Sequence, residues 1–438
     1  MKQYIILIIF FLLISSCSKE SSTKVSDEEE SLVNSEIPNI MLIIADDMGK
    51  DATPGYNIGT TKPHMPNLQS LIDNGIRFNN LWSYATCTPT RASILTGKYG
   101  YKTNVISVGD ELSTLETSLQ SYIDDQTGLT YEHAVIGKWH LSTSLSHPTD
   151  IGINHYSGSI SGGVRSYWDW NLVENTTSTA STDYTTTKFT DLAINWIDNQ
   201  TKPWFLWLAF NAPHTPFHLP DNSLHSQGNL PTDDASITAN PLPYYMAMLE
   251  AMDSEFGRLL KSMTQEEKDN TIFIFIGDNG TPNQVAQEYN SRRVKGSIYQ
   301  GGINVPMIIS GKGVSRKNET EDALLNTTDL FATIAAIAGA DVDEINDSKN
   351  FKNLFTTSSK IRDYVYAEYR NDATGLIDYS VRNATHKYIK FGDNTEALFN
   401  LIENPLENPN LLSANQSPLS NENELIKNEL IAKLNEYR

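Results

Sequence analysis

Basic residues are scarce in this sequence of 438 residues, which has 33 lysines and arginines against 53 aspartates and glutamates and a formal net charge of −20 at pH 7. Nucleic acid is excluded as a general partner, because phosphate binding needs a basic surface. A pocket for any anionic ligand must concentrate positive charge against the field of the whole protein. The length favours two or three domains and a large hydrophobic core.

Long hydrophobic runs are also lacking. The apolar run in MKQYIILIIFFLLISSC, at the N-terminus, has about ten residues, which is too short to span a bilayer and typical of a signal peptide. Ile14-Ser15-Ser16-Cys17 resembles a bacterial lipobox, which implies a lipoprotein signal peptide over residues 1–16 and lipidation of Cys17. Residues 17–37 are polar and acidic and predict a flexible tether. We expect an exported protein, lipid-anchored to a bacterial outer membrane on its cell-surface or periplasmic face; an ordinary secretory signal is the alternative.

Cysteine is nearly absent, since only Cys17 and Cys87 occur. With Cys17 lipidated, Cys87 has no partner in the chain and an intrachain disulfide is excluded. Cys87 is therefore either a buried structural residue or a reactive group.

Short apolar runs alternate with segments of helical spacing, which predicts an α/β fold with a mostly parallel sheet flanked by helices. After about residue 360 the pattern changes to short runs separated by turn residues, which predicts a small antiparallel sheet. We expect a large domain over residues 38–360 and a smaller C-terminal subdomain over 361–438. The expected strands are 39–45, 133–137, 204–210, 271–277 and 306–311, and the expected helices are 65–76, 185–200, 244–263, 324–340 and 421–438.

Polar residues of reactive types follow four of the expected strands. Ligands bind beyond the carboxyl ends of parallel strands, so these residues are expected to converge. The oxygen ligands among them suit a hard cation such as Ca²⁺ or Mg²⁺. Each pattern alone also fits a helix cap, a turn or a structural histidine. The residues are Asp46, Asp47, Lys138, His140, His214, Asp278 and Asn279.

Cys87 is expected at the start of a helix. Pro89 is favoured in a first helical turn, and TRASILTG can continue that helix to Gly97. The helix dipole favours negative charge at residue 87, and Arg91, one turn later, can reach back toward it. The geometry predicts an anionic site, suited to a thiolate or to a negatively charged intermediate.

The stretch CTPTRASILTG resembles the signature of type I sulfatases, in which the cysteine is oxidised to formylglycine. The segments IIADDMG, GKWHL, APHTP, GDNG and KGSIYQGGINVP resemble further segments of that family in the same order. The resemblance implies an alkaline-phosphatase-like fold, with the catalytic domain over 38–360. It also implies one Ca²⁺ per chain, held by Asp46, Asp47, Asp278, Asn279 and modified Cys87.

The resemblance further implies a sulfuric ester hydrolase. Hydrated formylglycine at residue 87 would attack sulfur and expel the alcohol, and loss of a proton from its second hydroxyl would release sulfate. His140 would help that deprotonation, His214 with Lys295 would protonate the leaving oxygen, and Lys138, Arg91 and Lys295 would neutralise the sulfate. Fixed cations and an acid–base pair of histidines suit such a reaction.

An extracellular sulfated glycan is the expected substrate, with marine algal polysaccharide such as ulvan ahead of host glycosaminoglycans. Arg165 and Trp168 in GGVRSYWDW, and His64 in TKPHMPN, are candidates for the sugar subsite, with an ordinary packed loop as the alternative. A formylglycine-generating (sulfatase-maturing) enzyme is the implied partner. The open alternatives are a phosphodiesterase or phosphonate monoester hydrolase of the same superfamily and a non-catalytic lipoprotein that binds sulfated glycan.

Overall fold

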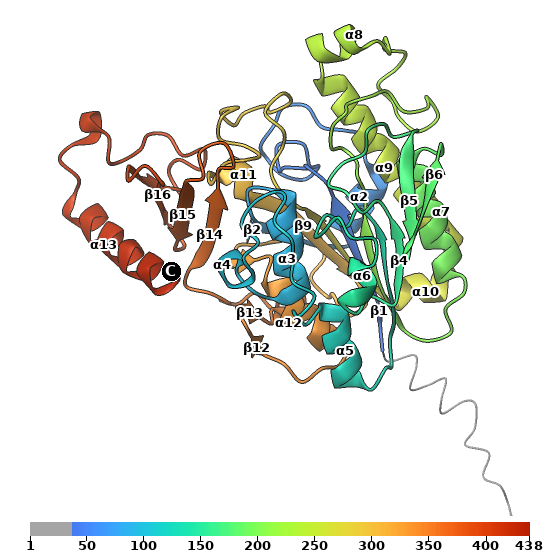
Figure 1. The fold of residues 1–438 in the computed structure, drawn as a ribbon. Coiled ribbons are helices and arrows are strands. Elements are labelled where there is room, and N and C mark those ends of the chain that lie inside the picture. Colours follow the sequence, from blue (N-terminus) through green and yellow to red (C-terminus); the bar gives the residue numbers. More distant parts are fainter. Residues whose placement is uncertain (1–36) are drawn as a thin grey trace, which may run out of the picture. The chain divides into compact units, whose positions relative to one another are not determined.

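The computed structural model describes residues 37–438 (Figure 1). The expected signal peptide, the lipidation site at Cys17 and nearly all of the expected tether lie outside the described residues. Within residues 37–438, no helix has both the length and the apolar character needed to cross a membrane.

The centre of the main sheet consists of four parallel strands made almost only of apolar residues. In order across the sheet they are β8 (Thr271–Gly277), β1 (Asn39–Ala45), β7 (Trp204–Ala209) and β3 (Glu132–Gly137). Ala209 pairs with both Ile44 and Gly137, and Ala45 pairs with Gly277, so the four carboxyl ends lie level. Nearly all residues of these strands are buried, as expected for strands covered on both faces.

Further strands extend this sheet to 11 strands. Beyond β3 come β4 (His155–Gly158), β5 (Trp170–Glu174) and β6 (Thr177–Ser181). Beyond β8 come β9 (Asn304–Gly311), β2 (Gly75–Trp82) and β10 (Glu319–Glu321), and β11 (Leu325–Asn326) also pairs with β2. Strand β9 is antiparallel to both of its neighbours. The α/β fold with a mostly parallel sheet is confirmed.

Helices cover both faces of the sheet (Figure 1). Alternate residues of β1 point to opposite faces: Ile40, Leu42 and Ile44 join one hydrophobic core, and Met41 and Ile43 join the other. The first core contains α3 (Cys87–Thr96), α5 (Leu119–Thr127) and α12 (Asp329–Ile337), and the second contains α2 (Pro66–Asp73), α7 (Thr185–Ile197) and α9 (Leu242–Ser262). The shorter helices are α4 (Gly100–Thr103), α6 (His147–Asp150), α8 (Asp234–Ala239), α10 (Gln265–Asp269) and α11 (Gln300–Ile303).

The C-terminal part forms the expected antiparallel sheet. Its strands are β14 (Val365–Arg370), β15 (Ile377–Arg382), β16 (His386–Lys390) and β17 (Glu396–Asn400), in sequence order. Helix α13 (Asn421–Glu436) packs against β15 and β16. Trp82 of the main sheet and Val365 of β14 share a hydrophobic cluster, so the two sheets are packed together. The expected boundary between residues 360 and 361 stays a prediction.

Four expected helices were too long: those over 185–200 and 421–438 end at Ile197 and Glu436, and the other two are shortened by a neighbouring strand. The helix expected over 65–76 ends at Asp73, because Gly75 begins β2. The helix expected over 324–340 begins only at Asp329, because Leu325–Asn326 pairs with β2. In both segments pairing with a neighbouring strand overrides helical periodicity. Small elements not expected from the sequence are β12 (Glu344–Ile345), β13 (Ser348–Lys349) and the 3₁₀ turns Lys352–Phe355 and Ala414–Gln416.

Candidate active site and metal centre

The reactive residues lie at the carboxyl ends of the four central strands. Asp46 and Asp47 follow β1, and Asp278 and Asn279 follow β8 on the neighbouring strand. The segments after β3 and β7 supply Lys138, His140 and His214 from the other side of β1. Because these strands end level, residues more than 200 positions apart in the sequence come into contact.

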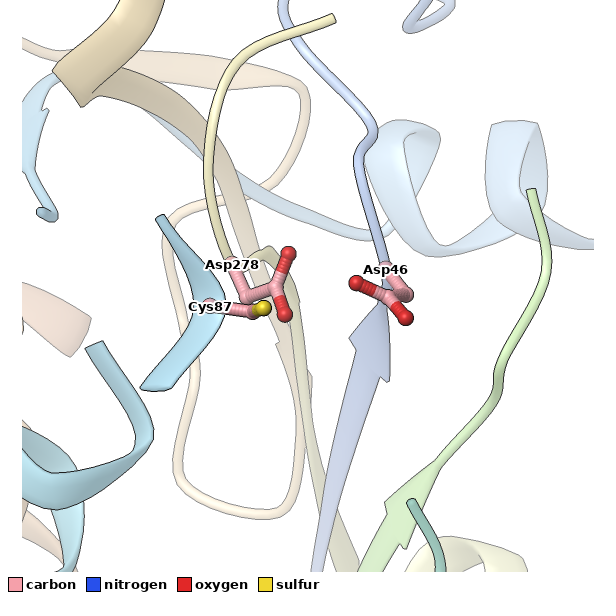
Figure 2. Close-up of side chains that lie close together, drawn as sticks. All are labelled: Asp46, Cys87 and Asp278. Atoms are coloured by element: carbon pink, nitrogen blue, oxygen red, sulfur yellow. The ribbon is translucent and has the colours of Figure 1, made fainter. Parts of the chain in front are cut away.

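Three potential ligands for a metal ion cluster at this edge. Atoms of Asp46, Cys87 and Asp278 lie within 4.8 Å of one another. Figure 2 shows the Cys87 sulfur beside the Asp278 carboxylate and the Asp46 carboxylate facing them. Asp46, Asp47 and His214 form a second group of the same kind, which overlaps the first at Asp46. All of these residues except the half-buried His214 are buried.

Each buried carboxylate has a cationic partner. Lys138 Nζ lies 2.6 Å from Asp46 Oδ2, and Lys295 Nζ lies 2.5 Å from Asp47 Oδ2. Arg91 donates to Asp278 Oδ2 from Nη2 at 2.8 Å and from Nε at 3.2 Å.

Arg91 also donates from Nη1 to the Lys138 carbonyl, at 2.8 Å. It therefore connects the segments after β8 and β3, and its bonded neighbours are Asp278 and Lys138.

Burial and neighbouring charges shift the pKa values of Asp278 and Asp47 in opposite directions. Burial raises the pKa of the Asp278 carboxyl to about 6, and repulsion from Asp46 adds to the rise. Burial would also raise the pKa of Asp47, but Lys295 and His214 outweigh it and lower that pKa to about 2. Of these two carboxylates, Asp278 is therefore the one whose charged form is disfavoured by its surroundings.

Two buried oxygens at the centre of this cluster have no hydrogen-bond partner: Asp46 Oδ1 and Asn279 Oδ1. Buried polar atoms are normally bonded, so such a pair requires an explanation. Asn279 uses its amide nitrogen for Asp47 Oδ1, at 2.8 Å, which leaves its carbonyl oxygen free to act as a ligand. Carboxylate and amide oxygens at one site fit a hard cation such as Ca²⁺. The residues present therefore fit the expected ion.

Cys87 is the first residue of α3, as expected, and the helix ends before Gly97, whose φ of 66° is left-handed. Of the two anionic groups expected to suit this position, a thiolate and a negatively charged intermediate, the thiolate is disfavoured by its surroundings. Burial raises the pKa of the Cys87 thiol; Lys138 counteracts this, while Asp46 and Asp278 add to the rise. The helix N-terminus would lower the pKa of this thiol, but burial and the nearby carboxylates raise it by more.

His140 contacts the side chain of residue 87. Its Nδ1 lies 3.1 Å from the Cys87 sulfur. Burial lowers the pKa of His140 well below 6.5, and the positive charges of Lys138 and Arg91 lower it further, so the ring is neutral and able to accept a proton. Both His140 and Asp47 have left-handed backbones, with φ of 59° and 71°. Non-glycine residues rarely adopt this conformation, and such strain concentrates at functional sites.

His214 has a defined tautomer. Its Nδ1 lies 2.8 Å from the Thr215 carbonyl, which can only accept a hydrogen bond, so Nδ1 carries a proton. The opposite nitrogen, Nε2, faces Asp47 Oδ2 at 3.8 Å. Since Nδ1 is engaged with the Thr215 carbonyl, Nε2 is the nitrogen of His214 that can exchange a proton with a substrate.

The sequence analysis missed the group that positions His214. The Tyr167 hydroxyl is buried and lies 2.7 Å from the His214 carbonyl and 2.8 Å from the Asn211 carbonyl. Tyr167 lies inside GGVRSYWDW, between the two residues chosen there as sugar contacts. No sequence signal distinguishes a buried tyrosine from an exposed tryptophan next to it.

The expected sugar contacts lie in different surroundings. Arg165 is exposed and lines a cavity of about 470 Å³ with Ser161, Gly163 and Asp169. The cavity adjoins His214, because a side-chain carbon on Gly163 would lie 3.2 Å from the His214 ring.

Trp168 is 39% exposed and stacks on Tyr184, with ring centres 5.0 Å apart. His64 is exposed, and its backbone is bonded to Glu250.

Comparison with known proteins gives consistent results over residues 38–438. The family model described as Sulfatase matches residues 38–340, and that described as N-sulphoglucosamine sulphohydrolase, C-terminal, matches residues 292–438. An arylsulfatase of Klebsiella aerogenes is 26% identical, over 70% of this chain and 88% of its own. Arylsulfatase G of Rattus norvegicus is 28% identical, over 69% and 65%.

Solved structures share the fold over most of the chain. The crystal structure of Ps i-CgsB in complex with k-i-k-neocarrahexaose has a TM-score of 0.79 and 25% identity, with 92% of each chain covered. The structure of BT4656 in complex with its substrate D-glucosamine-2-N,6-O-disulfate has a TM-score of 0.75 and 20% identity, with 92% of this chain and 98% of that chain covered.

Proposed function

Since the chain belongs to the sulfatase family and is a sulfuric ester hydrolase, we propose that it removes sulfate ester groups from extracellular sulfated glycans. The observation that carries the proposal is the buried cluster around residue 87, where three carboxylates are matched by three fixed cations. With a divalent cation added, this cluster becomes net positive. It then attracts a sulfate group in a protein whose net charge is −20.

A Ca²⁺ ion at this site would be held by Asp46, Asp47, Asp278 and Asn279. When bound, it would supply Lewis-acid stabilisation of negative charge on sulfate oxygens. The buried thiol of Cys87 is a poor nucleophile because its pKa is raised. Conversion of Cys87 to formylglycine supplies a hydrated aldehyde, whose hydroxyl is the attacking group.

The remaining chemistry belongs to the chain's own residues. The Cys87 sulfur marks the position that an oxygen on Cβ of the modified side chain would take, and neutral His140 is placed to accept a proton from it at Nδ1. His214 is placed to hold a proton at Nε2, beside Asp47, and to give it to the departing alcohol. Lys295, whose side chain is 23% exposed, lies at the accessible side of the cluster and can contact the sulfate directly.

A polysaccharide substrate is supported by two observations. Ps i-CgsB, 25% identical, was solved with a carrageenan-type hexasaccharide. The Arg165 cavity beside His214 has room for a sugar, and Arg165 can pair with a carboxylate or a second sulfate on it. The substrate class proposed is algal sulfated polysaccharide, with ulvan oligosaccharides, whose uronic carboxylate would meet Arg165, as the leading member.

Two modifications of the chain, at Cys87 and at Cys17, are part of the same proposal. A formylglycine-generating enzyme would modify Cys87. Lipidation of Cys17 would hold the enzyme at the outer membrane, next to polymeric substrate. Both steps are proposed from the sequence.

The test is sulfate release, measured by ion chromatography, from ulvan, carrageenan, fucoidan and heparin oligosaccharides and from a small aryl sulfate. The Cys87→Ala variant is the control, since it removes the nucleophile and keeps the fold. Release from ulvan that disappears in the variant supports the full proposal. Release from heparin alone overturns the algal assignment, and faster hydrolysis of a matched phosphate ester overturns the sulfatase assignment.

A further inference from the structure

The buried cations of this protein fall into two groups. Seven lysines and arginines are buried in the part of the chain that the structure describes. Five of them lie against a carboxylate: Arg91, Lys138, Arg316, Arg362 and Lys387. The other two, Lys50 and Arg382, have no carboxylate oxygen within 4.0 Å among the described residues, although burial of an uncompensated charge is costly.

These two cations line the same cavity. It has a volume of about 670 Å³ and lies between the segment after β1, the middle of β2 and the C-terminal sheet. Lys50 is 5% exposed and Arg382 is 3% exposed. None of the residues of the cluster around Cys87 lines this cavity, so it is a separate site.

Both cations retain unused hydrogen-bond donors. Lys50 Nζ donates to the Asn79 carbonyl and, at 2.7 Å, to Asn304 Oδ1, which leaves one of its three N–H groups. Arg382 donates once each from Nε, Nη1 and Nη2, to two carbonyls and to Asn80 Oδ1. Two of its five N–H groups therefore remain.

The electrostatics favour an additional anion. Burial lowers the pKa of Lys50 well below 10.5, and repulsion from Arg382 lowers it further, with Asp322 only partly opposing this. Burial lowers the pKa of Arg382 to about 10, although Glu407 and Asp322 counteract it. Two carboxylates, Glu288 and Asp322, also line the cavity, but neither is within ion-pair distance of the two cations.

The other residues that line the cavity indicate which kind of molecule would carry the anion. Asn79, Asn80, Gln300 and Asn304 offer amides to hydroxyl groups. The lining also has an apolar part that includes Ile402 and Leu406, which are 69% and 39% exposed. A sugar ring with an anionic substituent has both kinds of surface.

We propose that this cavity, the Lys50–Arg382 cavity, is a second, non-catalytic binding site for an oxyanion group, a sulfate or a carboxylate. The site itself follows from the two unpaired cations; that the oxyanion arrives on the same sulfated glycan as the substrate rests on the proposed function. Bound there, a second anionic group of a long chain would hold the polymer on the enzyme between cleavages.

The test is equilibrium binding of radiolabelled inorganic sulfate to the full chain carrying Cys87→Ala. Two sulfates per chain are expected. The added substitution Lys50→Met, which keeps the side-chain length, should remove one of them or weaken it roughly ten- to hundredfold, because a charge-assisted hydrogen bond is lost. Arg382→Leu should do the same, and if that variant does not fold, Lys50→Met decides.

The matched control is Lys102→Met, which removes an exposed lysine paired with Asp347 outside the cavity and should leave both sulfates bound. A κ-carrageenan tetrasaccharide and its desulfated form make the second arm. Weaker binding of only the sulfated form in Lys50→Met assigns the oxyanion to the glycan, and weaker binding of free sulfate alone assigns it to the reaction product.

Unchanged binding of both probes in Lys50→Met overturns the inference. Failure of the proposed function would look different, since sulfate release from every substrate would then be absent while the Lys50-dependent sulfate remained.

Discussion

Individual side chains at the strand ends account for the chemistry of this site. His140 is neutral although it lies in a cluster of charges, because burial and two neighbouring cations lower its pKa. His214 is half-buried and faces a carboxylate. The two histidines are thus differentiated by environment, which is how one site can hold a base and an acid at the same pH.

Replacement of His140 by glutamine should remove the base and keep the shape. We expect kcat to fall by about 10²–10⁴ with KM for a small aryl sulfate nearly unchanged. Steady-state kinetics measure both parameters. His225→Gln is the matched control, because His225 contacts the Pro220 carbonyl away from the cluster. An equal fall in both variants, or a loss confined to KM, would contradict the role of His140.

Removal of the cation should be visible without any activity measurement. Three buried carboxylates and the unpartnered oxygens of Asp46 and Asn279 are stabilised by a bound ion, so EGTA should lower the melting temperature and Ca²⁺ should restore it. In Asn279→Leu the restoration should be much smaller. A melting temperature that does not respond to EGTA or Ca²⁺ in the wild type would contradict the metal site.

The segment that follows β4 brings backbone against His140 and His214. A side-chain carbon on Gly162 would lie 2.1 Å from His140 Nε2. The close approach requires glycine, and it fixes the ring from the side opposite Cys87.

Gly162→Ala should therefore displace the His140 ring and reduce kcat at least tenfold, at a cost in stability of a few kcal/mol at most. Kinetics and urea unfolding measure the two effects. Gly228→Ala, in a loop where the added carbon meets no atom within 4 Å, should leave kcat unchanged. Full activity of Gly162→Ala would show that this segment does not position His140.

The loop after His214 is held by a second buried histidine. His218 accepts from the Tyr184 hydroxyl at Nε2, at 3.0 Å, and donates from Nδ1 to the Pro216 carbonyl. Burial lowers the pKa of His218 to about 4, against 6.5 for the free side chain. The unfolded chain therefore binds a proton at a higher pH than the folded chain, so stability is lost as the pH falls from 6.5 toward 4.

Between pH 7 and pH 5 this single residue should cost about 2 kcal/mol of unfolding free energy. Urea unfolding at the two pH values measures it. In His218→Gln the difference should shrink by about that amount, with all other titrating groups unchanged. An identical pH dependence in both proteins would rule out a buried neutral His218.

For the molecule as a whole, the important contrast is between a net charge of −20 and a locally cationic site. A polyanionic chain is repelled at long range and bound only at short range. Salt screens long-range repulsion first, because the Debye length falls to about 10 Å at 0.1 M.

We expect kcat/KM for a sulfated oligosaccharide to rise as NaCl increases from about 10 to about 100 mM. The rise should be smaller for a singly charged aryl sulfate. Progress curves at constant pH measure kcat/KM for both substrates. A steady fall of kcat/KM for the oligosaccharide over this range would contradict this account. It would mean that attraction to the cationic site, and not long-range repulsion, controls the rate of association.

The sequence alone was sufficient to predict the four central strands of the main sheet and the polar residues that follow them. The four central strands are continuous apolar runs, so their bounds are sharp, and the residues after them come together once the strands are parallel and level. It was insufficient to predict β2 and β4–β6. These strands are short or contain both polar and apolar residues, and they form because they pair with neighbouring strands. The raised pKa of the Cys87 thiol could not be predicted for a similar reason, since a helix terminus is a local signal and burial among carboxylates is not.

Conversion of Cys87 to formylglycine is the central claim, and the mass of the tryptic peptide 78–91, from protein purified from its own host, tests it most directly. The account predicts that an aldehyde replaces the thiol at residue 87. An unmodified cysteine in all of the protein would contradict it, because the buried thiol has a raised pKa and is a poor nucleophile.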